Sequence, residues 1–360
     1  MSYVAPKDYT QDPEIVAKIM RTISGQLELT WMKNIGERAA FRPSQTARGL
    51  TLDDINQGSY SPDHLPEIVR HNFSMAPRGA ILPPGLPSLG YRLNRKSDVW
   101  ADIAPRLYEE GKSRRWAPAH DVPWDALAKP GHSEDVAIAL RQLSTNLTSA
   151  GLVACDTAAS FEYRMNQEFH EIKFLMCVHM YDAARIAEAF RKRALAGDGQ
   201  LGVDCAEFGD FLKTIFVADS YAEASVSMNV LLFSWVQALG RHIEYTATNR
   251  ADTFLGTRLA QDASRFIAYG VAHIRNLLRV RPIEVERLDN HLDLAENALV
   301  GALGAPAMIE PLVLISGGFE PVVGLYERTV AEYFGRCLAA GLGDRSARSP
   351  LPEFLRMLRS

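Results

Sequence analysis

The chain has 360 residues, 47% of them apolar and 23% charged, which is enough for one large domain or two ordinary ones with a substantial core. Its formal net charge is −4 with Lys and Arg scattered along the chain, so it carries no electrostatic footprint for nucleic acid. It has no uncharged apolar run long enough for a membrane span, no secretory signal and no C-x-x-C spacing among its four cysteines, so we expect a cytoplasmic protein with reduced thiols.

Residues 1–98 are expected to form a helix followed by an arm. Asp12-Pro13-Glu14 is a helix start signal, which places a helix at about 12–34. The stretch 42–92 is rich in Pro, Gly and Ser, which predicts a segment wrapped on a core with little regular structure. Residues 100–128 are expected to begin as a helix and to end in a connection pinned by prolines and tryptophans.

The rest of the chain is expected to be helical, because apolar residues recur at steps of three and four and strand signals are absent. The pattern predicts helices at about 133–160, 163–195, 206–247, 250–281, 283–302 and 306–342. Cap and start signals mark the last four of them: Asp204, Asn249 or Asp252, Pro282 and Pro306. Helices this long are typical of an all-α long-helix bundle. We place the bundle at 99–303 and additional C-terminal helices at 304–360.

Two of the predicted helices contain the same short phrase. Asp182-Ala183-Ala184-Arg185-Ile186 is matched by Asp262-Ala263-Ser264-Arg265-Phe266 in the helix at 250–281. Positions three apart share one helix face, so Ala183 lies beside Ile186 and Ala263 beside Phe266. By itself, each Asp and Arg pair predicts an ion pair along its own helix, a contact that contributes about 0.2–0.5 kcal/mol.

This region, roughly 100–300, resembles the ferritin-like di-iron oxidases and oxygenases, relatives of the ribonucleotide reductase small subunit. Their motif is D-E-x-R-H, present once in each half of the bundle, with one further Glu on each preceding helix. The resemblance implies a ferritin-like bundle in which two Glu-x-x-His turns and two lone Glu residues hold two irons. In that family the Asp of the motif orients a metal-bound His.

The ligands of that family are missing from this chain, although the Asp and Arg residues around them are kept. Apolar residues stand at the ligand places Ala183, Ile186, Phe233, Ala263 and Phe266. The remaining place falls within 150–154 (AGLVA), which contains no carboxylate; Asp156 is the nearest. We therefore expect no di-iron cofactor and no other cofactor, and we expect Asp182 to find a new partner in an Arg across the bundle.

Other polar residues near the repeated phrases are candidates for a different chemistry. His179 lies on the face of Ala183 and His273 on the face of Phe266, which would bring both to one end of the bundle as a displaced metal or acid–base site. Satisfied histidines at the edge of a core are the structural alternative. Together with Asp182 and Tyr181, these two histidines are the candidate catalytic residues.

Three functions remain open. The first is a pseudoenzyme: a metal-free, non-catalytic subunit of a di-iron monooxygenase- or oxidase-type complex, acting as a homodimer or as a heterodimer with a ferritin-like paralogue. The second is an enzyme that reuses the former substrate cavity for metal-independent or different-cofactor chemistry on a small organic substrate. The third is a true oxygenase whose ligands lie at other positions. The vacated ligand places argue against a functional di-iron oxygenase acting on its own.

Overall fold

The computed structural model describes residues 3–4, 7–29, 50–55, 62–70, 75–77, 80, 82–85, 90–129 and 131–360. The described residues form an all-α structure, and apart from two isolated β-bridges they contain no strand. The elements before the bundle are α1 (Pro13–Ile23), α3 (Leu52–Ile55), η2 (Pro62–His64), η3 (Lys96–Asp98), α4 (Ala104–Ser113) and η4 (Trp124–Ala128).

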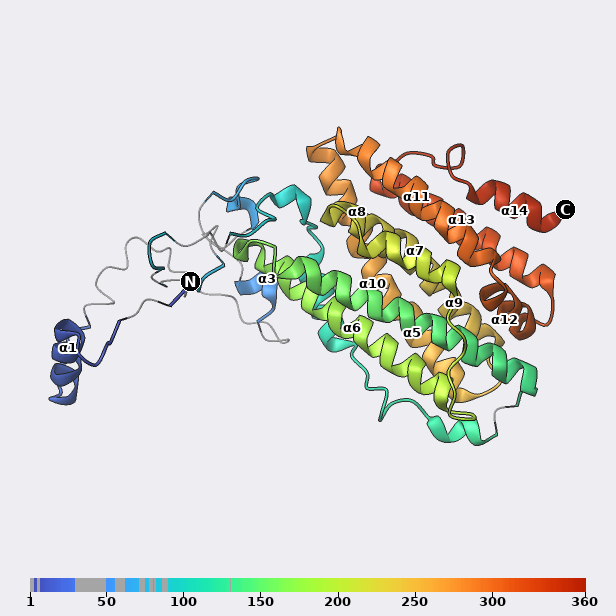
Figure 1. Ribbon diagram of the computed structural model, residues 1–360, viewed down its shortest axis with the longest axis horizontal. Helices are drawn as coiled ribbons and strands as arrows, with labels where there is room; N and C mark the ends of the chain where they lie inside the picture. The colour runs from blue at the N-terminus through green and yellow to red at the C-terminus, as the bar shows by residue number, and fades with distance from the viewer. Residues whose placement is uncertain are drawn as a thin grey trace.

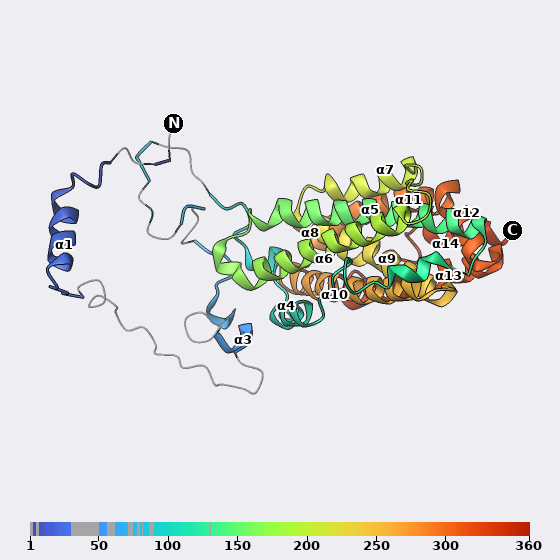
Figure 2. The same ribbon diagram turned by 90° about the horizontal axis from the view of Figure 1, so that it is seen from below.

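Two pairs of helices form the centre of the fold, α5 with α6 and α9 with α10, and they run alongside one another in both views (Figures 1 and 2). The elements of this bundle are α5 (Glu134–Glu162), η5 (Gln167–Phe169), α6 (His170–Leu195), α7 (Ala206–Phe216), α8 (Tyr221–Ser225), the π-helical segment η6 (Val226–Leu232), α9 (Phe233–Thr246) and α10 (Arg250–Val280). The all-α bundle expected from the periodicity is confirmed.

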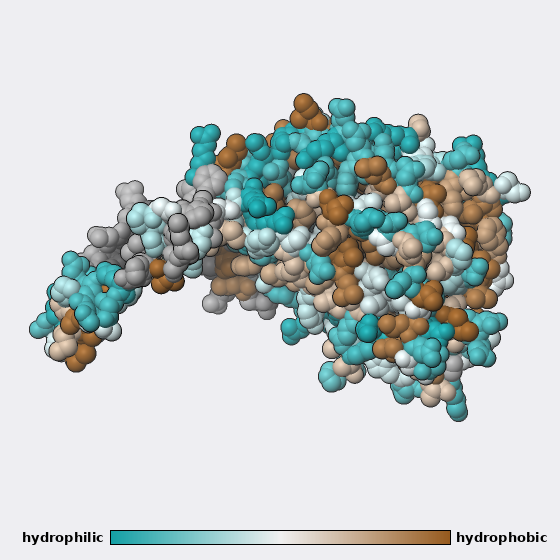
Figure 3. Space-filling model, in the orientation of Figure 1, coloured by the Kyte–Doolittle hydropathy of each residue, from teal (hydrophilic) through white to brown (hydrophobic). Residues whose placement is uncertain are grey.

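The C-terminal helices pack on the bundle and share its core. They are α11 (Glu284–Gly304), α12 (Pro306–Ser316), α13 (Phe319–Ala340) and α14 (Leu351–Arg359). Helix α11 packs against α7, α12 against α5, and α13 against α9 and α10. Buried residues such as Met308, Leu312 and Tyr326 belong to the same apolar cluster as Phe233. On the surface, apolar and polar side chains are interspersed on the face that Figure 3 presents.

Several helix ends follow the sequence signals. Asn249 accepts a hydrogen bond from the Asp252 backbone at 2.9 Å and begins α10. Asp12 caps α1, and Pro306 occupies the first position of α12. The expected cap at Asp204 is wrong: the N-cap of α7 is Cys205, and its side chain makes no capping bond.

Three of the predicted helices have different bounds. The helix expected at 12–34 ends at Ile23, followed by Gly25 at a φ of 81°, and residues 30–34 lie outside the described ranges. The helix expected at 306–342 breaks at Gly317, whose φ of 71° ends α12, so α12 and α13 replace it. The helix expected at 163–195 begins only at His170.

The helix expected at 206–247 is divided into α7, α8, η6 and α9. A capping box of Ser220 and Glu223 starts α8, so the chain leaves α7 at Val217 and begins a new helix. That helix then widens into η6 before it continues as α9. Among the described helices, only α5, α6 and α10 are longer than about 25 residues, whereas the sequence pattern predicted such a length for most of them.

Within the described residues, no single helix is long and apolar enough to cross a membrane. Helices α11 and α12 are long and apolar enough for a membrane span only when they are counted as one segment, and a bend of 56° separates them.

Candidate functional site

The two repeated phrases lie in the middle of the bundle, on α6 and α10, with their apolar residues facing the core. Ala183 and Ala263 are completely buried, as is Phe266, and Ile186 and Phe233 are almost so. All five belong to one apolar cluster with residues of α5 and α11. The five positions that the sequence resemblance assigns to metal ligands are therefore apolar core positions in this chain.

Stacked rings fill the space between three of the bundle helices. The ring of Phe233 on α9 lies 3.8 Å from that of Phe266 on α10, with an angle of 8° between the ring planes. On α6, the ring of His179 stacks with that of Phe266 at 4.2 Å. The edge of Tyr269 completes the group, 5.5 Å from His179. We call Phe233, Phe266 and His179 the ring stack.

On α5, one position of the stretch 150–154 has no room for a side chain. Gly151 on α5 is where the backbones of α5 and α6 approach each other. A Cβ atom placed on Gly151 would lie only 2.8 Å from the Ala183 carbonyl oxygen and 2.8 Å from the Ala187 backbone nitrogen. Asp156, the nearest carboxylate on α5, is exposed. At Gly151, α5 therefore contributes a backbone contact with α6 and no side chain.

Beside the ring stack, four buried charges from the repeated phrases bind one another across the bundle. The Asp182 carboxylate accepts hydrogen bonds from Arg185 Nη2 at 2.6 Å and from Arg265 Nη2 and Nε at 2.6 and 3.0 Å. Asp262 accepts from Arg185 Nη2 at 2.7 Å and also pairs with Arg265. These four side chains, which we call the charge quartet, are at most 2% exposed. Arg265 is the cross-bundle arginine expected for Asp182.

Trp116, in the connection between α4 and η4, closes the charge quartet from one side. Its indole Nε1 donates to Asp262 Oδ2 at 3.0 Å, and the Arg185 guanidinium lies 5.0 Å from its ring centroid. These contacts explain the pinned connection that the sequence indicated at 100–128. The role of Trp116 in the site was not predicted, because neither the spacing nor the repeat links it to α10.

The charge quartet contains two carboxylates and two guanidinium groups, and burial acts on the pKa of Asp182 and of Arg265. Burial, together with the Asp262 carboxylate, raises the pKa of Asp182 to about 6 against the opposing effect of the two arginines. Burial also lowers the pKa of Arg265, but the Asp182 and Asp262 carboxylates outweigh it, so this pKa lies above its ordinary value. Each charge therefore depends on the presence of the others.

His179 is buried without a polar partner. Neither of its ring nitrogens has a hydrogen-bond partner within the described part of the chain. Burial, followed by the Arg265 charge, lowers its pKa to about 3. At neutral pH the His179 ring is thus uncharged. Its buried nitrogens have lost their hydrogen bonds to water without gaining others, which lowers the stability of the fold.

His273 lies beyond Tyr269 in a different polar group. Its Nδ1 is 3.0 Å from Ser225 Oγ and its Nε2 is 2.8 Å from the Asp98 carbonyl oxygen, while burial lowers its pKa to about 4. Tyr269 stands between the two histidines, edge-on to His179 and stacked on His273 at 5.6 Å. The two histidines share this neighbourhood, but no hydrogen bond links them.

Tyr181, the remaining catalytic candidate, is 52% exposed and contacts Arg185 from outside, with the guanidinium 5.1 Å from its ring centroid. A further buried contact, in which the Tyr221 hydroxyl donates to that of Tyr269 at 2.8 Å, was not predicted from the sequence. Two surface grooves, of about 720 and 540 Å³, lie elsewhere and are not lined by the ring stack.

No protein-family model matches this chain, and neither does any curated protein. Solved structures do match. A variant of an R2-like ligand-binding oxidase with an aerobically reconstituted Mn/Fe cofactor superposes with a TM-score of 0.53 at 18% identity, covering 67% of this chain and 94% of that one. A second variant, with an anaerobically reconstituted Mn/Fe cofactor, gives 0.52 at 19% identity with the same coverage. The chain has the ferritin-like fold of the R2-like ligand-binding oxidases.

The R2-like fold implies a two-metal centre, and the residues of this chain do not fit one. A Mn/Fe or di-iron pair requires carboxylate and imidazole donors that converge on the bundle axis. Here that position holds two phenylalanine rings, two alanines and an isoleucine, with Gly151 pressed against α6. Among the described residues, no three His, Cys, Asp or Glu side chains are arranged to hold a metal ion.

Proposed function

We propose that the chain is a metal-free ferritin-like protein that acts as the non-catalytic, partner-organising subunit of a di-iron oxidase- or monooxygenase-type complex. The observation that carries this proposal is the ring stack of Phe233, Phe266 and His179 in the place of the metal ligands. A protein that had lost only its metal would keep several carboxylates buried together, each at a cost of several kcal/mol. This chain instead has a packed apolar centre.

The charge quartet supports the same proposal. In the family that the sequence resembles, the Asp of the motif orients a metal-bound His. Here Asp182 and Asp262 are bound by Arg185 and Arg265, so the polar surroundings of a lost site have become a self-contained ion cluster. The chain keeps the ferritin-like fold of the R2-like oxidases, and in this proposal its outer surface binds a subunit that does carry metal.

The test is to express the full chain together with its genomic neighbours in medium supplied with iron and manganese, and to isolate it under native conditions. We expect metal far below one ion per chain and a co-isolated second chain with intact D-E-x-R-H motifs. About two metal ions bound per copy of this chain would overturn the proposal. Ala263→Glu combined with Phe266→His is the matched variant, and it should still bind no iron because the other ligand places remain apolar.

One observation favours the alternative, an enzyme that uses the former cavity for other chemistry on a small organic substrate. His179 is a buried imidazole with both nitrogens free of partners in the described structure, and such a group can accept a hydrogen bond from a ligand. His179→Ala separates the two functions. It should leave assembly with the partner subunit unchanged under the main proposal, and it should abolish product formation under the alternative.

A further inference from the structure

Helix α1 carries an apolar face that the described chain does not cover. Ile15, Ile19 and Ile23 follow one another at four-residue steps, with Val16 and Met20 beside them, so all five lie on one side of the helix. No residue of α1 is buried, and Ile23 is 73% exposed. Figures 1 and 2 show α1 next to none of the bundle helices.

The charges of α1 are arranged around this face. By helical phase Lys18 lies about 60° from Ile15, at the edge of the polar side with Thr22 between them, and Arg21 lies about 60° further round, opposite the apolar face. Arg21 Nη1 is already bound to Glu28 of the same segment at 2.8 Å. A surface that receives α1 should therefore be apolar, with acidic groups along one edge to meet Lys18.

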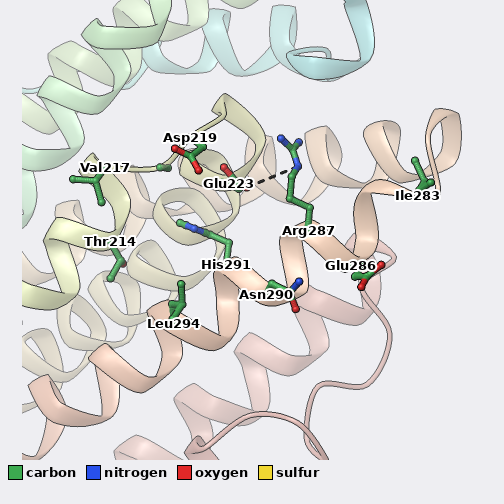
Figure 4. A pocket seen from close by; sticks show the side chains of 11 residues that line it. Thr214, Val217, Asp219, Glu223, Ile283, Glu286, Arg287, Asn290, His291 and Leu294 are labelled. Atoms are coloured by element: carbon green, nitrogen blue, oxygen red, sulfur yellow. Dashed lines mark ion pairs between the residues drawn. The ribbon is translucent and has the colours of Figure 1, made fainter.

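The described part of the fold contains such a surface, which we call the α11 groove. It has a volume of about 540 Å³ and lies between the α7–α8 connection and the first turns of α11 (Figure 4). Val217, Ile283 and Leu294 line it, and all three are well exposed, Ile283 by 83%. Large apolar side chains gathered in a groove and left open to water are typical of a binding surface.

Three acidic residues, Asp219, Glu223 and Glu286, line the α11 groove beside one arginine. Its one arginine, Arg287, is held by Glu284 at 2.6 Å and by Glu223 at 3.8 Å, the latter contact being drawn in Figure 4. Asp219 and Glu286 also line the groove, and neither forms an ion pair with any described residue. The groove thus combines apolar walls with two unpaired carboxylates, which is the counterpart of the α1 face and Lys18.

We propose that α1 of one copy docks in the α11 groove of a second copy, and that the exchange is reciprocal. Helix α1 is about 16 Å long, and residues 24–51 can extend to at most roughly 90 Å, so the arm reaches a neighbouring molecule. Reciprocal exchange makes the same contact twice in a twofold dimer and covers both apolar surfaces. This contact is independent of metal content, so its failure leaves the proposed function untouched.

The first experiment measures self-association of the full chain by sedimentation equilibrium. The wild-type chain is expected to form a dimer. Ile19→Asp on α1 and Ile283→Asp in the groove should each raise the dimer dissociation constant by at least about tenfold. Both residues are exposed, so circular dichroism and thermal unfolding should match the wild type. Arg21→Glu, on the far side of α1, is the matched control and should leave the dissociation constant unchanged.

The second experiment mixes the Ile19→Asp chain with the Ile283→Asp chain. The first retains an intact groove and the second an intact α1, so a mixed dimer keeps one of its two contacts. We expect heterodimers in the mixture at concentrations where neither variant dimerises alone. A monomeric wild-type chain, a dimer indifferent to Ile19→Asp, or a mixture without heterodimers would overturn the proposal.

Discussion

Arg265 on α10 donates two hydrogen bonds to the carboxylate of Asp182 on α6, from Nε at 3.0 Å and from Nη2 at 2.6 Å, in the buried centre of the bundle. Each residue comes from one copy of the repeated phrase, so the contact joins the two halves of the bundle. The bridging element here is an ion pair between side chains. The two halves of the bundle are thus connected by buried side-chain charges.

The charge quartet should make the protein sensitive to the loss of any one member. Asp182→Asn leaves Arg185 and Arg265 to share the single carboxylate of Asp262, so one buried positive charge is uncompensated. We expect a loss of about 3–5 kcal/mol in the free energy of unfolding. The measurement is denaturant unfolding at pH 7.5.

A double variant separates two contributions to the free energy of unfolding: the interaction between Asp182 and Arg265, and the penalty for leaving one of these charges buried without a partner. Asp182→Leu with Arg265→Met removes one charge of each sign and leaves Arg185 paired with Asp262 at 2.7 Å. Its destabilisation should be smaller than the sum of the two single variants by roughly 2 kcal/mol or more. Additive losses would show that the two residues do not act as a pair.

His179 should lower stability at neutral pH. Its two ring nitrogens are buried without partners in the described structure, whereas its ring stacks on Phe266. His179→Phe keeps the stacking and removes the desolvated nitrogens, so we expect an increase of about 1–2 kcal/mol in the free energy of unfolding. Tyr181→Phe, on the exposed side of the same helix, is the control and should change stability by less than about 0.5 kcal/mol.

The same histidine should make stability fall in acid. The pKa of His179 is about 3 in the folded chain, against about 6.5 when unfolded, so below pH 6 the unfolded state binds a proton that the folded state does not. Stability therefore decreases as the pH falls, by about 1.4 kcal/mol per pH unit for this residue. Asp182 acts in the opposite direction, because its raised pKa favours the protonated folded state below about 6. Comparing wild type with His179→Phe between pH 6 and 4 isolates the histidine.

Sequence patterns predicted the long helices well and their interruptions poorly. The apolar period and the Asn249 cap define α10, because both signals are local. The break before α8 depends on a capping box that the continuous apolar pattern conceals, and the break after α12 depends on a left-handed Gly317. In each case a short local signal ends a helix that the period alone would continue.

The site was predictable only in part, for a similar reason. The repeated phrases indicated which positions face the core and which carry charges. The stacking of Phe233, Phe266 and His179 involves side chains from three helices, and the indole of Trp116 reaches Asp262 from a connection. Such contacts depend on how the helices are placed relative to one another, which spacing along one helix does not determine.

Gly151 should be intolerant of any side chain. A Cβ atom there would lie 2.8 Å from two backbone atoms of α6, and helix backbones cannot yield as a flexible side chain would. We expect Gly151→Ala to cost about 1–3 kcal/mol, measured by thermal and denaturant unfolding. Gly209→Ala in α7 is the matched control: a Cβ there meets nothing within 4 Å, so it should stabilise the protein by up to about 1 kcal/mol. Equal effects of the two substitutions would mean that α5 and α6 do not meet at Gly151.

Arg345 should hold the C-terminal segment on the bundle. Its buried guanidinium binds the fully buried Glu296 of α11, at 2.7 Å through Nε, and reaches Asp293 at 2.8 Å. The Tyr333 hydroxyl of α13 donates to the same Glu296 carboxylate at 2.6 Å, so one acidic group connects α11, α13 and the segment before α14.

Arg345→Met leaves the Glu296 carboxylate buried with no cation beside it, and we expect a loss of about 3–5 kcal/mol together with faster proteolysis after residue 340. Arg348→Met is the control. Arg348 binds Asp293 at 2.6 Å, but its side chain is 43% exposed, so its removal should cost no more than about 1 kcal/mol. Each variant removes one arginine charge, and the two positions are three residues apart. The difference between their losses in the free energy of unfolding therefore measures the effect of burying the ion pair. Similar losses would place Glu296 in contact with water and contradict the packing of α13 on α11.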